Sequence, residues 1–206
     1  MLFCPKGENT DLNSNYEKYK ELLSKMLTEK RYYHSLCVAD EARRLAEKYG
    51  GDPEKCYLAG LLHDITKNIP PEEHLKIFTS FGIMLSDIEK KTRKLWHAIT
   101  GEAYIKNVLG ITDGELLDAV RYHTTAKADM SLTAVILYLA DFTSLDRDYE
   151  DVEVIRELVN KSLEEAMVYA LKFSISELTE EGKFIHPDTV DAYNDTLLFG
   201  GKKWTH

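Results

Sequence analysis

Hydrophobic residues recur every three or four positions over most of the chain, a spacing that is typical of amphipathic helices. Capping residues divide this pattern: Asp52-Pro53, Ser86 with Glu89, and Ser131 each precede a helical run. No segment alternates hydrophobic and polar residues as a half-buried strand does. The sequence therefore predicts an all-α fold. Helices are expected at about residues 14–30, 31–49, 53–64, 72–80, 113–123, 132–145, 152–173 and 190–198. A capping box at Ser86 leads through a basic run into a further apolar helical segment that ends at Gly110.

Three of these helices carry more specific expectations. Ser14 and Glu17 form an S-x-x-E capping box, which places the start of the first helix after a frayed lead-in of about a dozen residues. The segment 152–173 is interpreted as one continuous amphipathic helix that serves as scaffold. His74 lies on the charged side of the helix at 72–80, so we expect a solvated side chain there.

Histidines and acids occur where this helical pattern turns inward. The adjacent pair His63-Asp64 ends an apolar run, and such a pair suits a metal, because a carboxylate can bridge two ions while the imidazole binds one. Asp141 also follows an apolar run, where an acid is costly unless it is paired or ligated. One such residue alone would be explained by packing at a helix end. Six together favour a dinuclear metal site with N and O ligands: His34, His63, Asp64, His97, His123 and Asp141.

Length and composition narrow the setting. The 206 residues fit one domain, which at this size buries about 70% of its unfolded surface. The three cysteines, Cys4, Cys37 and Cys56, are odd in number and lack zinc-finger spacing, which favours a reduced, cytoplasmic environment. No apolar stretch approaches the roughly 18 residues of a membrane-spanning helix, so no membrane partner is expected.

Charge also limits the partners. The formal net charge of -9 disfavours a nucleic-acid-coating role, because such proteins carry a basic face. A small anionic substrate would need a local positive pocket in so acidic a chain. The basic run at residues 90–94 is interpreted as a solvated face, with an anionic ligand as the alternative.

The order H…HD…H…H…D resembles the HD-domain superfamily of metal-dependent phosphohydrolases, and its details are similar to the YqeK-type branch of symmetrical dinucleoside tetraphosphate hydrolases. Two segments depart from that branch: Ala126 stands where a Gly is expected, and Phe142-Thr143-Ser144-Leu145 replaces Lys-Ile-Glu-Pro. These departures bear on the nucleotide pocket rather than on the metals. The resemblance rests on Arg31 to His34, Ala59 to Asp64 with Lys67, His97, His123-Thr124, Ala140-Asp141 with Arg147, and Ile185 to Pro187 with Tyr193-Asn194.

The resemblance implies a single all-helical HD domain over residues 1–206, with a metal-site core at about 15–148 and a C-terminal helical extension at about 149–206. It implies one ion held by His34, His63, Asp64 and Asp141, and a second held by Asp64, His97 and His123. Asp64 would bridge them. Iron is the first choice of metal, with Mn, Co or Zn as alternatives. A metal-bound hydroxide would cleave diadenosine tetraphosphate in its middle to give two ADP molecules.

The same resemblance assigns substrate contacts. Lys67 and Arg147 would neutralise charge on the polyphosphate during the reaction, and Arg31 and Thr124 would bind it as well. A homodimer is left open.

Three other functions remain open. A mononuclear HD nucleotidase would use His34, His63, Asp64 and Asp141 alone. A di-iron HD oxygenase would use similar ligands but consume oxygen. A nucleotide-sensing module that is not an enzyme would not need an intact six-ligand set.

Overall fold

The computed structural model describes residues 9–204, with side chains from Tyr16 to Phe199 and at Trp204. Every regular element in this range is helical, and no strand occurs in it. The predicted all-α fold is confirmed. The elements are α1 (Asn9–Met26), α2 (Glu29–Tyr49), α3 (Pro53–Leu62), α4 (Pro71–Ser80), α5 (Asp87–Lys91), η1 (Arg93–Leu95), α6 (Trp96–Asn107), α7 (Gly114–Tyr122), α8 (Leu132–Thr143), α9 (Val152–Val159), α10 (Leu163–Glu180) and α11 (Pro187–Lys203).

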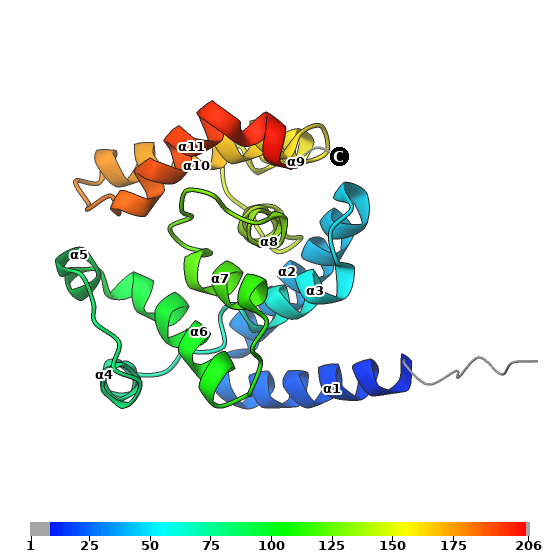
Figure 1. Ribbon diagram of the computed structural model, residues 1–206, viewed down its shortest axis with the longest axis vertical. Coiled ribbons are helices and arrows are strands. Elements are labelled where there is room, and N and C mark those ends of the chain that lie inside the picture. Colours follow the sequence, from blue (N-terminus) through cyan, green and yellow to red (C-terminus); the bar gives the residue numbers. More distant parts are fainter. Residues whose placement is uncertain (1–8, 205–206) are drawn as a thin grey trace, which may run out of the picture.

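Helix α8 lies at the centre of the bundle (Figure 1). It contacts α2, α3 and α7 on one side and α9 and α10 on the other. Eight consecutive residues, 133–140, are buried, as expected for a helix that is apolar on all sides. The helices α9 to α11 form a layer across one side of α8, and α1 lies at the opposite end of the molecule (Figure 1).

Helices α2 and α3 approach each other closely at Gly60. A Cβ atom at this position would lie 2.7 Å from the Cα atom of Ala39, so only glycine fits without displacing backbone. The close approach holds the end of α3 against α2. This backbone contact alone places His63, at the end of α3, near His34 of α2.

The N-terminal helices differ from prediction at their boundaries. α1 already begins at Asn9, so Ser14 lies inside the helix and its predicted capping box is wrong. Only residues 1–8 of the expected lead-in, with Cys4 among them, lie outside the described part of the chain. α1 also ends at Met26 rather than near residue 30, because Thr28 caps α2 by accepting a hydrogen bond from the Arg31 backbone N–H.

The single helix predicted at 152–173 is wrong as well. The chain forms α9 and α10 with a break after Val159, and α10 continues to Glu180. Ser162 caps α10 by accepting from the Glu165 backbone N–H, and the Tyr49 hydroxyl donates to the Val159 carbonyl at 2.6 Å. In the sequence, the S-x-x-E spacing of Ser162 and Glu165 is a capping-box pattern that indicates a new helix start at this point.

His74 is buried, contrary to the expected solvated position. Its Nδ1 atom lies 2.8 Å from the Thr100 hydroxyl of α6, and its ring packs beside Phe78 and Trp96. The charged neighbours on α4 suggested solvent, but α6 covers this side of the helix. None of the helices in the described part of the chain is long and apolar enough for a bilayer span.

Candidate metal centre

The six histidine and aspartate residues singled out in the sequence meet in one buried cluster. Five of them are at most 4% exposed, and the Asp141 side chain is 18% exposed. Neighbouring imidazole rings lie with their centroids 5.0 to 5.3 Å apart. The residues come from five parts of the fold: His34 from α2, His63 and Asp64 from the end of α3, His97 from the start of α6, His123 from the end of α7, and Asp141 from α8.

Two of the imidazoles are oriented by helix ends. His63 follows α3, and its Nδ1–H donates to the Gly60 carbonyl at 2.6 Å. His123 follows α7, and its Nδ1–H donates to the Val120 carbonyl at 2.7 Å. The last carbonyls of a helix have no partner inside the helix, so each ring satisfies one of them. Both contacts fix the tautomer and direct Nε2 into the cluster.

His34 is oriented by an acid instead. Its Nδ1 atom lies 2.8 Å from Asp146 Oδ2, and Asp146 accepts a second hydrogen bond from the Ser144 hydroxyl at 2.8 Å. The Nε2 atom of His34 lies 3.0 Å from Asp141 Oδ1. A carboxylate behind the outer nitrogen is typical of metal-ligating histidines. Asp146 could not be identified from the sequence, where its only signal is its position five residues after Asp141.

Asp64 lies between the histidines. Its Oδ1 atom is 3.1 Å from His97 Nε2 and 3.6 Å from His123 Nε2, whereas its Oδ2 atom is 3.5 Å from His63 Nε2. Burial alone would raise the pKa of this carboxyl, but electrostatic attraction to the surrounding histidines, His63 first, holds it well below its usual range. The ionised carboxylate thus presents its two oxygens to different imidazoles.

Several of these atoms have no hydrogen-bond partner among the described residues. They include His34 Nε2, His63 Nε2 and Asp64 Oδ1, all fully enclosed. A buried polar atom without a partner is costly, and a bound cation would satisfy all three. Burial lowers the pKa of His97 to about 4, which keeps the ring neutral and able to ligate at neutral pH.

The ligand atoms are close enough for metal binding. Two overlapping groups have all their ligand atoms within 4.8 Å of one another: His34, His63 and Asp141, and His63, Asp64 and His123. Imidazole and carboxylate ligands suit Fe, Mn, Co or Zn. The residues therefore fit a metal.

Comparisons with known proteins place this cluster in a family. The HD domain family model matches residues 31–146, which include all six residues of the cluster. The chain belongs to the HD domain family. Its fold is similar to that of a solved "predicted HD superfamily hydrolase involved in NAD metabolism" from Clostridium acetobutylicum, with a TM-score of 0.86, 36% identity, and coverage of 89% of this chain and 97% of that one.

Curated relatives of similar length carry a more specific name. A protein of Bacillus subtilis is 31% identical over 87% of this chain and 96% of its own length. A protein of Halalkalibacterium halodurans is 34% identical over 89% and 98%. Both are named "Bis(5'-nucleosyl)-tetraphosphatase, symmetrical".

In this HD domain, two of the residues expected to bind substrate lie against the acids of the cluster. Arg31 Nη1 is 2.8 Å from Asp64 Oδ2. Arg147 contacts the Asp141 carboxylate and also donates from Nε to the Asp141 carbonyl at 2.6 Å. The Asp141 contact raises the pKa of Arg147 despite its burial. Both arginines are thus placed to orient carboxylates.

The other two expected residues line a cavity that reaches the cluster. Lys67 Nζ lies 2.9 Å from His97 Nε2 and 3.5 Å from Asp64 Oδ1, and burial lowers the pKa of Lys67. Lys67, His97 and Thr124 form the inner end of a cavity of about 750 Å³. This volume lies within the usual range of small-molecule sites. The walls are residues 91–95 on one side and residues between Ser174 and Thr189 on the other.

Proposed function

We propose that the protein is a metal-dependent hydrolase that cleaves dinucleoside tetraphosphates symmetrically into two nucleoside diphosphates. The observation that carries this proposal is the buried Asp64 carboxylate, whose two oxygens face different histidines beside the inner end of a large cavity. The names of relatives that match nearly full length, at 31% and 34% identity, support the substrate.

We assign the metal ligands in two sets that share Asp64. His34, His63, Asp64 and Asp141 would hold one ion, and Asp64, His97 and His123 the second. Iron is the first choice, with Mn, Co or Zn as alternatives. A pair of such ions supplies an acidified water at neutral pH and positive charge for the phosphoryl oxygens.

Neighbouring residues orient the proposed ligands and supply groups for the substrate. The carbonyls of Gly60 and Val120 and the carboxylate of Asp146 hold three imidazoles with Nε2 directed inward. Lys67 lies between the cluster and the cavity, where its ammonium group can bind a phosphate beside the ions. Thr124 offers a hydroxyl at the same end.

Product analysis tests the proposal directly. The purified protein is incubated with diadenosine tetraphosphate and Fe(II), Mn(II) or Co(II), and the nucleotides are separated. We expect ADP as the sole product. ATP with AMP would mean asymmetric cleavage and would contradict the proposal. Oxygen consumption during turnover would instead indicate an oxygenase.

Metal counting tests the two ligand sets. Protein purified without chelators should contain two ions per chain by elemental analysis. His97→Ala should retain one, because His97 belongs to the second set only. A single ion in the wild-type protein, unaffected by His97→Ala, would favour a mononuclear nucleotidase.

A further inference from the structure

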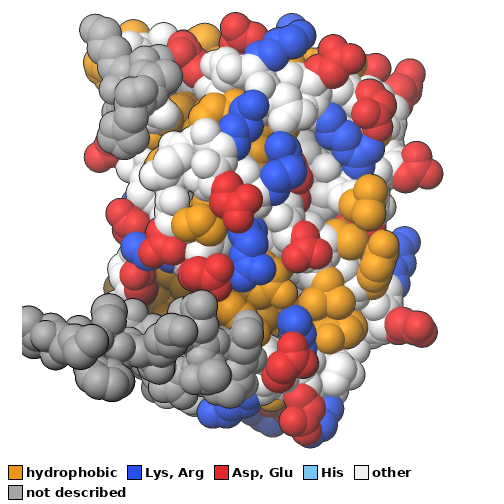
Figure 2. Space-filling model, turned by 90° about the vertical axis from the view of Figure 1, so that its right-hand side faces the viewer, with side chains coloured by type: hydrophobic (Ala, Val, Ile, Leu, Met, Phe, Trp, Pro, Cys, Tyr) orange, Lys and Arg blue, Asp and Glu red, His pale blue; other side chains and the backbone are white. Residues whose placement is uncertain are grey.

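The outer part of the cavity has a charge opposite to that of the chain. The chain carries a formal net charge of -9, and on the face shown in Figure 2 basic and acidic side chains are interspersed. The cavity lining instead contains more cations than acids. Apart from Lys67 at the inner end, its cations are Lys91, Arg93, Lys94 and Lys183, and its acids are Glu177 and Glu181. A cleft lined mainly by one sign of charge attracts ligands of the other sign.

These cations differ in their availability to a ligand, because Lys183 is ion-paired with Glu181. Lys90 forms an ion pair with Asp87 at 3.1 Å and does not line the cavity. Its neighbour Lys91 does line the cavity, and it makes no ion pair with any described residue. Lys91 lies instead over an aromatic ring, with Nζ 5.8 Å from the centroid of Phe184.

Phe184 adds an exposed aromatic face to the same place. It lies between α10 and α11, and 55% of its surface is exposed. In Figure 1, α5 and the α10–α11 connection lie on the same side of the molecule, and the Lys91–Phe184 contact joins them. An aromatic ring beside cations suits a nucleotide, because the ring stacks on the base while the cations bind phosphates.

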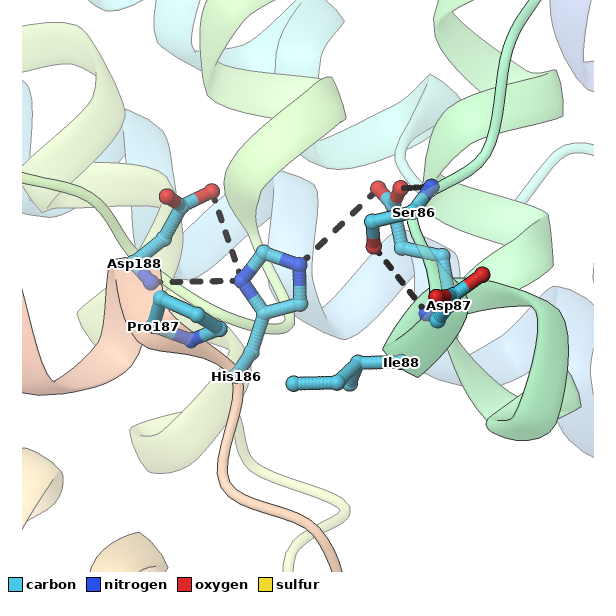
Figure 3. A pocket seen from close by; sticks show the side chains of 7 residues that line it. Ser86, Asp87, Ile88, His186, Pro187 and Asp188 are labelled. Carbon is cyan, nitrogen blue, oxygen red and sulfur yellow. Dashed lines mark hydrogen bonds and ion pairs between the residues drawn. The ribbon is translucent and has the colours of Figure 1, made fainter.

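The two walls are held together next to this contact. His186 accepts a hydrogen bond from the Asp188 backbone N–H at 3.2 Å (Figure 3). The His186 Nε2 atom lies 4.0 Å from Glu89 Oε1. Glu89 is itself fixed by the Ser86 capping box and by Arg121 at 2.6 Å. Glu89 lies two residues before Lys91, and His186 lies two residues after Phe184. The Glu89–His186 contact therefore holds Lys91 and Phe184 close to each other.

We infer that Lys91, Lys183 and Phe184 form a distal subsite for the second nucleoside diphosphate of the substrate, the half that leaves when the first half reacts at the metal centre. This inference rests on the proposed function and extends it to the preference for dinucleoside over mononucleoside polyphosphates. The distal base stacks on Phe184, and its phosphates lie beside Lys91, with Lys183 nearby in its ion pair with Glu181. Free ADP binds the same subsite as a product.

Kinetics on two substrates test the subsite. Phe184→Ala and Lys91→Ala should each raise KM for diadenosine tetraphosphate by about tenfold. The rise in KM should be clearly smaller for bis-para-nitrophenyl phosphate, a phosphodiester that contains no nucleotide and therefore cannot occupy the distal subsite. The matched controls are Phe81→Ala, an exposed aromatic residue after α4, and Lys90→Ala; both should behave as wild type. Equal effects on the two substrates, or no effect of Phe184→Ala and Lys91→Ala, would overturn the inference.

Calorimetric titration of the metal-loaded protein with ADP separates this inference from the proposed function. We expect Phe184→Ala and Lys91→Ala to weaken ADP binding by about tenfold, and Lys90→Ala to leave it unchanged. Unaltered ADP affinity in the first two variants overturns the subsite even if the tetraphosphate is cleaved. If the wild-type protein makes no ADP from the tetraphosphate, the proposed function fails, and the titration still decides whether the subsite exists.

Discussion

The metal cluster and the outer cavity of this protein are built in opposite ways. In the cluster, each of His34, His63 and His123 is buried and held by one specific backbone carbonyl or carboxylate. In the outer cavity, charged side chains from two segments about 90 residues apart face solvent around one exposed ring. Metal binding needs fixed ligand geometry, whereas a charged substrate needs attraction and room to enter. The two regions should therefore respond differently to substitution.

The largest effect is expected at the centre of the buried region. Asp64→Ala removes the carboxylate that faces the histidines of both ligand sets, so activity should fall on the order of 10³-fold or more. Metal content should fall with it, while circular dichroism should show that the helices persist. Asp40→Ala, an exposed acid on α2, is the control. If Asp64→Ala keeps a tenth of wild-type activity, Asp64 does not bridge the metals.

The contents of the buried region could be predicted from sequence because of helical periodicity. A histidine or acid on an apolar helix face has few ways to be satisfied, so the sequence alone singles out His34, His63, His97 and Asp141. The partners that orient them could not be predicted. Asp146 and Arg147 act through contacts made only when the segment after α8 returns to α2 and to Asp141.

The outer cavity could not be predicted for a related physical reason. Lys91 and Phe184 are polar and apolar residues of surface segments without periodic constraint, and only the packing of α11 near α5 brings them together. From the sequence, the basic run at residues 90–94 is interpreted as a solvated face, with an anionic ligand as the alternative. The cavity lining supports the alternative for Lys91, Arg93 and Lys94. The sequence constrains buried positions more strongly than exposed ones.

Substitutions of Arg147 show whether this residue supports the metal cluster or binds the substrate. Its contacts with Asp141 place it in the buried region, so Arg147→Ala should lower metal affinity by about 10–100-fold and kcat/KM by roughly 10–10³. Arg147→Lys should recover only part of the loss, since a single ammonium cannot reproduce the two contacts. Metal content and affinity are measured by elemental analysis and competition with a chelator. A lower kcat/KM with unchanged metal affinity would mean that Arg147 binds phosphate instead.

Asp146 gives a smaller and more selective effect. Asp146→Ala removes the acceptor behind His34, so metal affinity should fall by about 10–100-fold, nearer the lower limit because Asp141 still faces His34. KM for the tetraphosphate should change less than metal affinity when metal is saturating. Asp148→Ala, two residues away and exposed, is the matched control. If the two variants behave alike, His34 does not depend on Asp146 for its orientation.

The smallest effect is expected at His74, which is buried but belongs to neither the metal cluster nor the outer cavity. Burial lowers its pKa from the ordinary value of 6.5, so below that pH the unfolded chain binds a proton that the folded chain does not. Stability should therefore rise with pH in this range, and the contribution of His74 is lost as pH falls below about 6.5.

His74→Asn keeps a donor near the Thr100 hydroxyl but cannot titrate. It should cost about 1 kcal/mol of unfolding free energy at pH 8 through lost packing on Phe78 and Trp96. Denaturant titrations from pH 8 to pH 5 should show a shallower loss of stability than in the wild-type protein. Glu73→Gln, on the exposed side of the same helix, should retain the wild-type slope. Parallel wild-type and His74→Asn profiles would mean that His74 does not cause the loss of stability in acid.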